Sequence, residues 1–123
     1  MVADSFICIV DDDDSMRKAL SRLARQLGNE VRGFASAEQF VSSGCAEQCD
    51  CVVTDLQMRE MSGLDLMAWL ASNYPSIDVL MVTGFATPDV EAAALERGAI
   101  GVFRKPLDFD LFTAALKRAT AQD

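Results

Sequence analysis

The sequence predicts an α/β protein in which β-strands and α-helices alternate along the chain around one parallel sheet. Two observations lead to this prediction. Short apolar segments alternate with longer segments whose apolar residues recur at helical spacing. Several short segments are apolar nearly throughout, as expected for strands covered by helices on both faces. Five such strand–helix pairs follow one another, and right-handed crossovers between parallel strands give the most economical architecture.

The first strand is expected at residues 6–10, where five apolar residues stand in a row, and the first helix follows at 15–27. Apolar residues recur in this helix at intervals of three and four, and Gly28 marks its end. Asp13 and Asp14 fall where the helix starts, and carboxylates favour the positive end of the helix dipole. These two aspartates are therefore interpreted as solvated helix-start residues, not as ligands.

The second strand is expected at 30–34. Ser36 then starts the second helix, and Gln39 three residues later predicts a capping box. The third strand is expected at 51–54, and the third helix starts near Gly63. The inward face of this third helix is predicted from its apolar residues Leu64, Met67, Ala68 and Ala71.

The last two pairs are bounded by proline, glycine and capping residues. Residues 74–76 break the third helix, and the fourth strand follows at 78–82. Thr87 caps the fourth helix, with a proline in its first turn and a glycine after its end. The fifth strand is expected at 99–103, and Asp108 caps the fifth helix. The inward stripe of that helix is predicted as Leu111, Phe112, Ala115, Leu116 and Ala119.

Length and charge narrow the class of function. The 123 residues contain no repeat, low-complexity tract or linker, which predicts a single domain over residues 1–123. Eleven basic and nineteen acidic residues give a net charge of −8, which argues against binding of nucleic acid or an anionic membrane by this domain itself. The sequence has no apolar run of transmembrane length and no signal peptide, so a cytoplasmic location is expected.

The four cysteines do not form a recognisable metal motif. Cys8 lies in the first predicted strand, where a small buried hydrophobic residue is the expected role. Cys45, Cys49 and Cys51 have the spacing C-x3-C-x-C, which is not a usual zinc spacing, and the chain has no histidine. No metal is expected there, and reduced thiols fit a cytoplasmic setting.

Polar side chains follow four of the predicted strands at the point where each strand ends. They are Asp11 and Asp12 after the first strand, Asp55 after the third, Thr83 after the fourth and Lys105 after the fifth. Because the carboxyl ends of parallel strands meet at one edge of a sheet, these side chains are expected to converge. The second strand ends in a phenylalanine and adds nothing polar, so it is expected to lie to one side.

These residue types suit phosphoryl transfer. Three carboxylates favour a hard cation such as Mg²⁺, which would relieve their repulsion. A carboxylate can also attack phosphorus and form an aspartyl phosphate. The transferred group then needs positive charge and hydrogen-bond donors around its oxygens. Mg²⁺, the ammonium of Lys105 and the hydroxyl of Thr83 are the expected sources.

With these residues in place, the chain resembles the receiver domain of a two-component response regulator over essentially its whole length. The resemblance runs from "IVDDD" through "TDLQM", "MSGLDL", "MVTGFA" and "FRKPLD" to the last predicted helix. Each motif alone is weak, but their order on consecutive strand–helix units is specific. The resemblance implies a flavodoxin-like fold with strand order 2-1-3-4-5 and a cis peptide bond between Lys105 and Pro106.

The resemblance also implies the roles of the site residues. Asp55 corresponds to the phosphoacceptor, Thr83 to the hydroxyl that moves toward the phosphoryl group, and Lys105 to the ammonium that pairs with it. The implied Mg²⁺ ligands are the side chains of Asp11, Asp12 and Asp55 and the main-chain oxygen of Gln57.

The implied function is signalling by phosphorelay, not enzymatic turnover of a substrate. A sensor histidine kinase or a phosphotransfer protein donates the phosphoryl group from a phosphohistidine, and the domain assists both the transfer and the later hydrolysis of the acyl phosphate. Phosphorylation shifts a pre-existing two-state equilibrium at the surface of the fourth helix, fifth strand and fifth helix. That surface is expected to control an effector domain or protein partner, transcription factors included, and homodimerisation on phosphorylation.

The sequence departs from the family pattern at three positions. Arg59 stands where the family usually has a proline, which should loosen or re-aim the loop after the third strand. Val102 stands where an aromatic residue often rotates inward on activation. Either Phe103 substitutes for it or Thr83 couples to the surface differently. Phe85, together with Gln57, is hypothesised to slow access of hydrolytic water to the acyl phosphate.

Three other functions are compared with this one. An aspartyl-nucleophile phosphatase typically has a second acid two residues after the nucleophile, where this chain has Gln57. A flavin mononucleotide carrier needs a phosphate-binding loop after the first strand, where four aspartates would repel the phosphate. A pseudo-receiver acts only as a protein-interaction module and never takes phosphate. The departures at Arg59 and Val102 keep this last alternative open.

Overall fold

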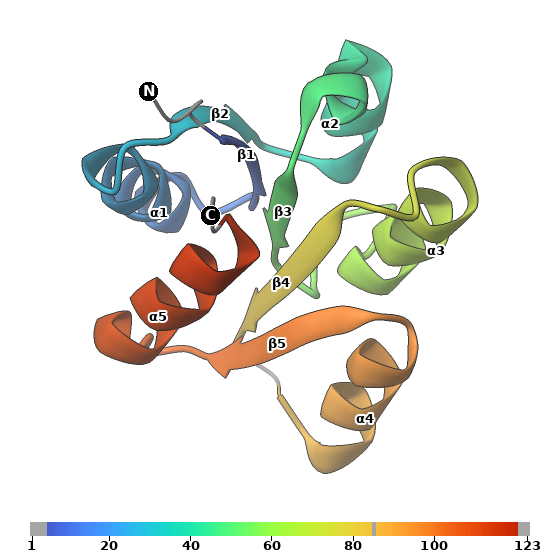
Figure 1. Cartoon of the computed structure of the whole chain (residues 1–123). Coiled ribbons are helices and arrows are strands. Elements are labelled where there is room, and N and C mark those ends of the chain that lie inside the picture. Colours follow the sequence, from blue (N-terminus) through green and yellow to red (C-terminus); the bar gives the residue numbers. More distant parts are fainter. Residues whose placement is uncertain (1–4, 85, 121–123) are drawn as a thin grey trace.

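A computed structural model describes residues 5–84 and 86–120 and shows the predicted α/β architecture (Figure 1). Five parallel strands form one sheet in the order β2-β1-β3-β4-β5. The strands are β1 (Phe6–Val10), β2 (Glu30–Phe34), β3 (Cys51–Thr54), β4 (Asp78–Thr83) and β5 (Ala99–Arg104). The predicted strand order and the position of β2 at the edge are confirmed. The last two strands each run one residue further than expected.

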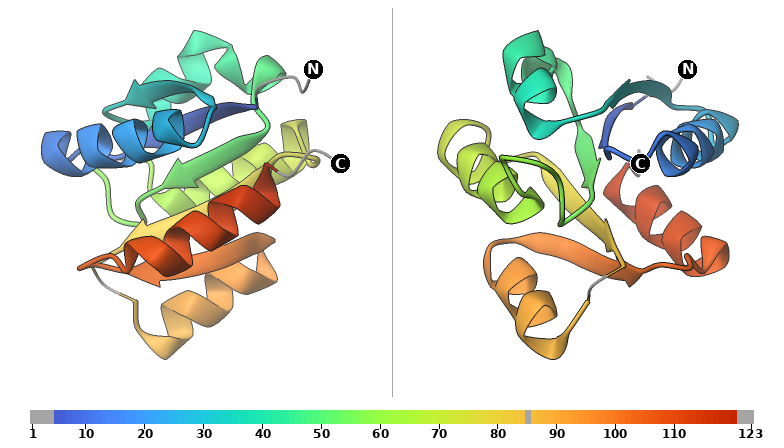
Figure 2. Two further views of the ribbon diagram at one scale, coloured as in Figure 1. Left: turned by 60° about the vertical axis from the view of Figure 1, so that its left-hand side comes forward. Right: turned by 180° about the vertical axis from the view of Figure 1, so that it is seen from behind.

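Helices cover both faces of the sheet, with α1 and α5 on one side and α2, α3 and α4 on the other (Figure 2). They are α1 (Asp14–Gln26), α2 (Ala37–Ser43), α3 (Gly63–Asn73), α4 (Pro88–Glu96) and α5 (Phe109–Ala119). A short 3-10 helix, η1 (Cys45–Gln48), lies between α2 and β3 and was not predicted. None of the helices in the described part of the chain has the length and apolar character needed to cross a membrane.

Side chains at the helix starts fix where each helix begins. The hydroxyl or carboxylate oxygens of Asp13, Ser36, Ser62, Thr87 and Asp108 each accept a hydrogen bond from a backbone N–H of the first turn. Among the helices of residues 5–84 and 86–120, a complete capping box is found only at α3. The box predicted for α2 is half wrong, because the Gln39 side chain accepts from the N–H of Ala35 and not from that of the cap residue.

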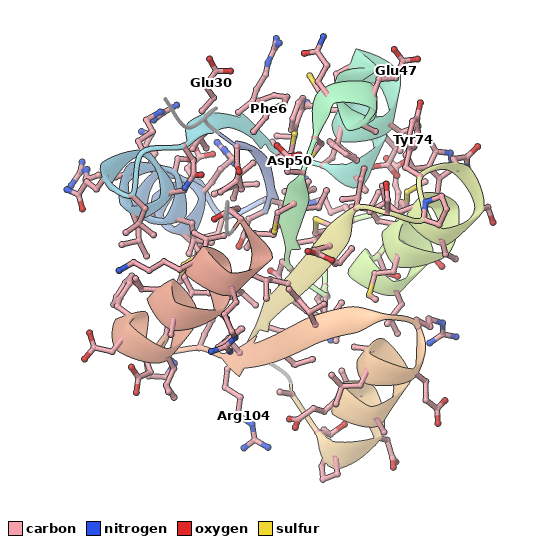
Figure 3. All side chains as sticks on the ribbon, in the orientation of Figure 1. Phe6, Glu30, Glu47, Asp50, Tyr74 and Arg104 are labelled. Atoms are coloured by element: carbon pink, nitrogen blue, oxygen red, sulfur yellow. The ribbon has the colours of Figure 1, made fainter. Side chains whose placement is uncertain are left out.

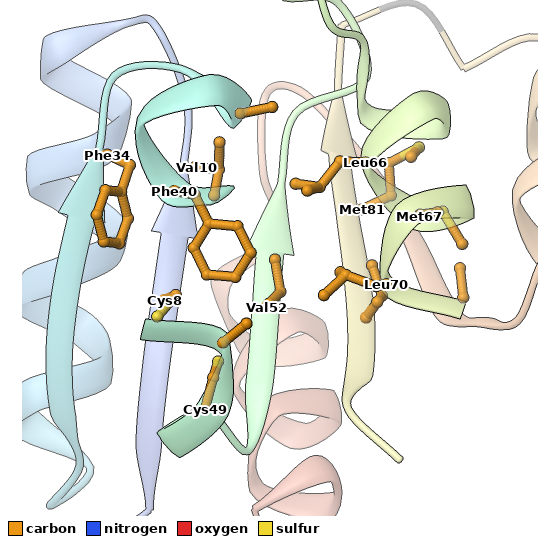
Figure 4. Close-up of a cluster of buried hydrophobic side chains, with 14 of the residues drawn as sticks. Cys8, Val10, Phe34, Phe40, Cys49, Val52, Leu66, Met67, Leu70 and Met81 are labelled. Carbon is orange, nitrogen blue, oxygen red and sulfur yellow. The ribbon is translucent and has the colours of Figure 1, made fainter. Parts of the chain in front are cut away.

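Two buried clusters fill the space between the sheet and its helices. Alternate residues of each strand point to opposite faces, so Ile7 and Val53 face α1 and α5, whereas Cys8 and Val52 face the other helices. Figure 4 shows the second cluster, in which Phe40 of α2 packs between the strands and the helices. Both faces of the central strands are therefore covered, which explains their continuous apolar sequence.

The inward faces of two helices differ from the prediction. The buried residues of α3 are Gly63, Leu66, Met67 and Leu70, while Ala68 and Ala71 are exposed and Leu64 is only half-buried. The helix is rotated because burying two leucines removes more apolar surface from water than burying two alanines. In α5 the stripe is confirmed at Phe112, Ala115 and Leu116, but Leu111 is 62% exposed.

Candidate functional site

The site lies at the carboxyl ends of the strands, where β1 and β3 are neighbours. Asp11 directly follows β1, and its N–H donates to the Phe34 oxygen at 3.1 Å. Asp55 directly follows β3, and its N–H donates to the Val10 oxygen at 3.0 Å. These bonds extend the strand pairing by one residue on each strand. The two aspartates are therefore held side by side by the backbone of the sheet.

Lys105 reaches from the end of β5 into the space between these two aspartates. Its Nζ donates to Oδ2 of Asp11 at 3.3 Å and to Oδ2 of Asp55 at 3.2 Å. Its backbone N–H donates to the Thr83 oxygen at 2.9 Å, which ties the end of β5 to the end of β4. The peptide bond between Lys105 and Pro106 is cis. The predicted convergence of the lysine with the two carboxylates is confirmed in position.

Three carboxylates form the acidic part of the site. One oxygen from each of Asp11, Asp12 and Asp55 lies within 4.8 Å of the others. Asp11 and Asp55 are buried, whereas Asp12 is exposed at the mouth. Carboxylate oxygens are hard donors that suit Mg²⁺, so the residues present fit this ion. Gln57 follows on the exposed loop, where its N–H donates to Oδ1 of Asp55 at 3.4 Å.

The electrostatics of the site favour an additional cation. Burial raises the pKa of Asp11, and the charge of Asp55 adds to this, while the N–H of Asp13 and the ammonium of Lys105 oppose it. Burial lowers the pKa of Lys105, but the two carboxylates outweigh burial, and the net pKa is raised. The Lys105 ammonium pairs with two of the three carboxylates, which leaves negative charge in excess.

The acidic run after β1 divides into two parts. Asp13 caps α1 by accepting from the N–H groups of Ser15 and Met16. Asp14, the first residue of the helix, forms an ion pair with Arg17. The interpretation of Asp13 and Asp14 as helix-start residues is therefore confirmed.

Two site contacts were missed by the sequence analysis. Nη1 of Arg17 donates to the main-chain oxygen of Asp11 at 2.8 Å, so an α1 side chain holds the loop of the acidic site. The buried Thr54 hydroxyl donates to the main-chain oxygen of Asp55 at 2.9 Å. The contact of Arg17 with Asp11 could have been suspected only weakly from the sequence, because the one hint is a basic residue one turn into α1. The contact of Thr54 with Asp55 could not have been predicted, because a threonine at the end of a strand is common.

The loop after β3 is held in a defined shape. The N–H of Met61 donates to Oε2 of Glu38 at 2.8 Å, and Glu60 has a left-handed backbone with φ of 62°. Arg59 lies in this loop and lines two adjoining cavities together with Asp12, one of about 400 Å³ and one of about 550 Å³. The expectation of a loosened loop concerns its mobility and stays a prediction.

Thr83 and the residues beside the lysine take distinct positions. Thr83 ends β4, is fully buried and pairs in register with Arg104. Val102 packs with the cluster under α3 and α4, whereas Phe103 points to the opposite face and packs edge-to-face on Phe112 at 5.5 Å between ring centroids. Phe103 therefore does not occupy the side of the sheet that Val102 faces. The hypothesis about Phe85 concerns a residue outside the described ranges.

Comparisons with known proteins point to one family. The sequence model of the response regulator receiver domain matches residues 7–117. The chain is 35% identical to the response regulator protein TmoT of Ectopseudomonas mendocina, over 94% of this chain and 53% of that protein. It is 33% identical to the response regulator protein TodT of Pseudomonas putida, over 94% of this chain and 51% of that protein. Thus it spans about half the length of these curated relatives.

The fold comparison agrees. The solved structure of the BeF3-activated DrrB receiver domain superposes with a TM-score of 0.90 and 25% identity, covering 98% of this chain and 100% of that one.

Proposed function

Because the chain belongs to the response regulator receiver domain family, we propose that it acts in phosphorelay signalling with Asp55 as the residue that accepts the phosphoryl group. The observation that supports this most directly is the position of Lys105, whose ammonium lies 3.2 Å from Asp55 and 3.3 Å from Asp11. An ammonium held beside a carboxylate is the arrangement that phosphoryl transfer to that carboxylate needs.

In the proposed reaction a carboxylate oxygen of Asp55 attacks the phosphorus of a phosphohistidine on a sensor kinase or phosphotransfer protein. The new bond joins this oxygen to phosphorus, and the bond from phosphorus to the imidazole nitrogen breaks. Lys105 then pairs with one phosphoryl oxygen, and the Thr83 hydroxyl donates to another. The same groups assist the later attack of water that returns the carboxylate. The domain thus assists its own modification and does not turn over a separate substrate.

Mg²⁺ is the proposed cofactor, and four groups would hold it. They are the carboxylates of Asp11, Asp12 and Asp55 and the main-chain oxygen of Gln57. The ion would supply positive charge that offsets the carboxylates and the incoming phosphoryl oxygens. The close approach of the three carboxylate oxygens in the structure supports this set.

The proposed output surface comprises α4, β5 and α5. Large apolar side chains are exposed on all three elements, namely Leu95, Ile100, Phe109 and Leu111. Phosphorylation of Asp55 would shift this surface between two states and so control an effector domain, a protein partner or homodimerisation. Transcription is a fitting output, since the similar ZraR of Escherichia coli is named a transcriptional regulatory protein. The domain itself would act in the cytoplasm without binding nucleic acid.

The second candidate is a pseudo-receiver that works as an interaction module without phosphate. Arg59 in the loop after β3 and Val102 in β5, the two departures from the family pattern, favour it. Retention of Asp55, Thr83 and Lys105 at one edge of the sheet weighs against it.

Intact-mass spectrometry after incubation with acetyl phosphate tests the proposal. Wild type and Asp55→Asn would be compared with and without Mg²⁺. We expect one phosphoryl adduct on wild type that requires both Mg²⁺ and Asp55. A folded protein that takes no adduct under any of these conditions would establish the pseudo-receiver instead.

A further inference from the structure

A basic groove runs along α1 on the side that faces the edge strand β2. It has a volume of about 580 Å³, and its lining includes the cations Arg17, Lys18, Arg22 and Arg25 together with Ser21 and Gly33. Within the described part of the chain, no carboxylate is among the residues that line it. Because the chain has a net charge of −8, this groove is a local concentration of positive charge on an acidic protein.

The floor of the groove is the backbone of β2, whose first residue, Glu30, is labelled in Figure 3. Side chains alternate along the strand, so Val31 and Gly33 face α1, whereas Phe34 packs on the opposite face. A Cβ on Gly33 would lie 3.1 Å from Cγ and 3.2 Å from Cδ of Arg17. The missing side chain therefore gives room to the aliphatic part of Arg17 and leaves the groove open between α1 and β2.

The cations at the two ends of the groove are held by the fold. Nη1 of Arg17 donates to the main-chain oxygen of Asp11 at 2.8 Å, and its Nη2 pairs with Asp14. At the other end, Nη2 of Arg25 donates to the main-chain oxygen of Val31 at 3.4 Å. These contacts set the positions of both guanidinium groups before a ligand binds, which lowers the entropy cost of binding.

The two cations between these ends are not neutralised by the protein. Lys18 and Arg22 are one helical turn apart and exposed, and neither forms an ion pair with a carboxylate of residues 5–84 and 86–120. From Arg17 to Arg25 the cations extend over about 12 Å of the helix axis. The groove therefore offers a row of positive charge with the length of a short peptide segment.

We propose that this groove binds an acidic, extended segment of a protein partner. Alternate residues of an extended chain point to the same side about 7 Å apart, and successive turns of α1 are about 5.4 Å apart. Carboxylates at alternate positions can therefore each meet a cation of the next turn. A nucleic acid also carries regular negative charge, but the net charge of −8 repels so dense a polyanion.

The proposal does not rest on the phosphorelay function, because none of the residues proposed to hold the phosphoryl group or Mg²⁺ lines the groove. Failure of phosphorylation would leave the groove and its charges as they are. Conversely, a groove that binds no peptide would leave the case for Asp55 unchanged.

Fluorescence anisotropy tests the proposal with a labelled peptide of about ten residues in which glutamate alternates with serine. A peptide with glutamine in place of glutamate and an oligothymidylate are the comparison probes. The groove variant combines Lys18→Glu with Arg22→Glu. Its matched control combines Lys117→Glu with Arg118→Glu, which makes the same change in net charge at exposed cations of α5. Gly33→Val keeps every charge but fills the floor of the groove.

We expect the wild type to bind the glutamate peptide, more weakly at about 0.3 M than at about 0.05 M salt. The glutamine peptide and the oligothymidylate should bind at least about tenfold more weakly. The groove variant should lose at least about tenfold in affinity for the glutamate peptide, whereas the α5 variant should stay within about twofold of wild type. Gly33→Val should also weaken binding, because its side chain displaces Arg17 and narrows the groove.

Circular dichroism checks that each variant is folded, and Lys18→Gln with Arg22→Gln replaces the groove variant if charge reversal unfolds it. Three results would overturn the proposal. Equal losses in the groove and α5 variants would show attraction to net charge alone. Binding of the oligothymidylate in preference to the peptide would assign the groove to nucleic acid. No binding of the glutamate peptide at low salt, or sedimentation showing a second copy of the chain in the groove, would exclude an acidic partner segment.

Discussion

The main-chain oxygen of Asp55 packs directly against Gly63, the first residue of α3. A Cβ placed on Gly63 would lie 2.3 Å from that oxygen and 3.0 Å from the Cα of Leu56. The N–H of Gly63 donates to the main-chain oxygen of Leu56, the residue after Asp55, at 2.8 Å, so a hydrogen bond beside this contact also holds the two segments together. The start of α3 thus fixes the backbone of the proposed phosphoacceptor, and no side chain fits between them.

Gly63→Ala should destabilise the protein by about 1–3 kcal/mol, because backbone atoms on both sides must move to admit the methyl group. Urea unfolding measures the change. Gly84→Ala is the matched control, since a Cβ there meets nothing within 4 Å. Equal stability of the two variants would show that the contact with Asp55 tolerates a side chain.

Arg17→Lys should weaken Mg²⁺ binding roughly tenfold, as expected when a partner that orients a ligand is lost. The Arg17 guanidinium donates to the main-chain oxygen of Asp11 and pairs with Asp14. A lysine keeps the positive charge but lacks the planar guanidinium group that can bind both partners at once. Calorimetric titration with Mg²⁺ measures the affinity. Arg22→Lys, an exposed position on the same helix, is the control. If both variants bind Mg²⁺ as wild type does, the hydrogen bond from Arg17 to Asp11 has no role in the metal site.

Thr83→Ala should still accept a phosphoryl group on Asp55 but should lose the response of the α4, β5 and α5 surface. The reason is that Thr83 lies at the end of β4 and pairs in register with Arg104 of β5. Amide chemical shifts of these elements before and after acetyl phosphate report the response. Thr83→Ser keeps a hydroxyl and should retain most of it. A full response in Thr83→Ala would place the coupling elsewhere.

Phe103→Ala should lower the free energy of unfolding by about 2–4 kcal/mol but should leave the response of the α4, β5 and α5 surface to phosphorylation intact. Its ring packs on Phe112, on the face away from α4, so its loss leaves a cavity without altering the proposed switch. Unfolding in urea and the same chemical-shift experiment test the two parts. Loss of the surface response in a folded Phe103→Ala variant would indicate that Phe103 substitutes for the aromatic residue that the family often has at the position of Val102.

Stability should fall as pH rises above 9, partly because of Cys51. Burial raises the pKa of this thiol above its ordinary value of 9.0. Between that value and the raised one, the unfolded chain loses a proton that the folded protein keeps, so unfolding becomes easier by about 1.4 kcal/mol per pH unit. Cys51→Ala should make the free energy of unfolding fall less steeply between pH 9 and 10, because the contribution of this thiol is removed. Val53→Ala, on the same face, should lower stability equally at every pH.

Local sequence signals predicted most of the fold. The strands 6–10, 30–34 and 51–54 were placed as observed, because their apolar runs are bounded by clear turn and capping residues. The rotation of α3 was missed, since alanines and leucines both count as apolar in a helical pattern and only packing shows which are buried. The 3-10 helix η1 was missed because four residues give too short a pattern to detect.

The convergence of the polar residues that follow the strands could be inferred from the sequence, because parallel strands bring their carboxyl ends to one edge of the sheet. This topology by itself predicts that Asp11, Asp55 and Lys105 lie together. The full strand order was implied by the resemblance to receiver domains. Contacts that depend on where a helix docks could not be inferred. The hydrogen bond from Arg17 to Asp11 and the closeness of Gly63 to Asp55 both depend on how a helix packs on the sheet, which no local sequence pattern records. The chemical groups of the site were determined by the sequence alone, while the backbone and side-chain contacts that hold them in place were decided by tertiary packing, because side chains remote in sequence meet only when the helices close on the sheet.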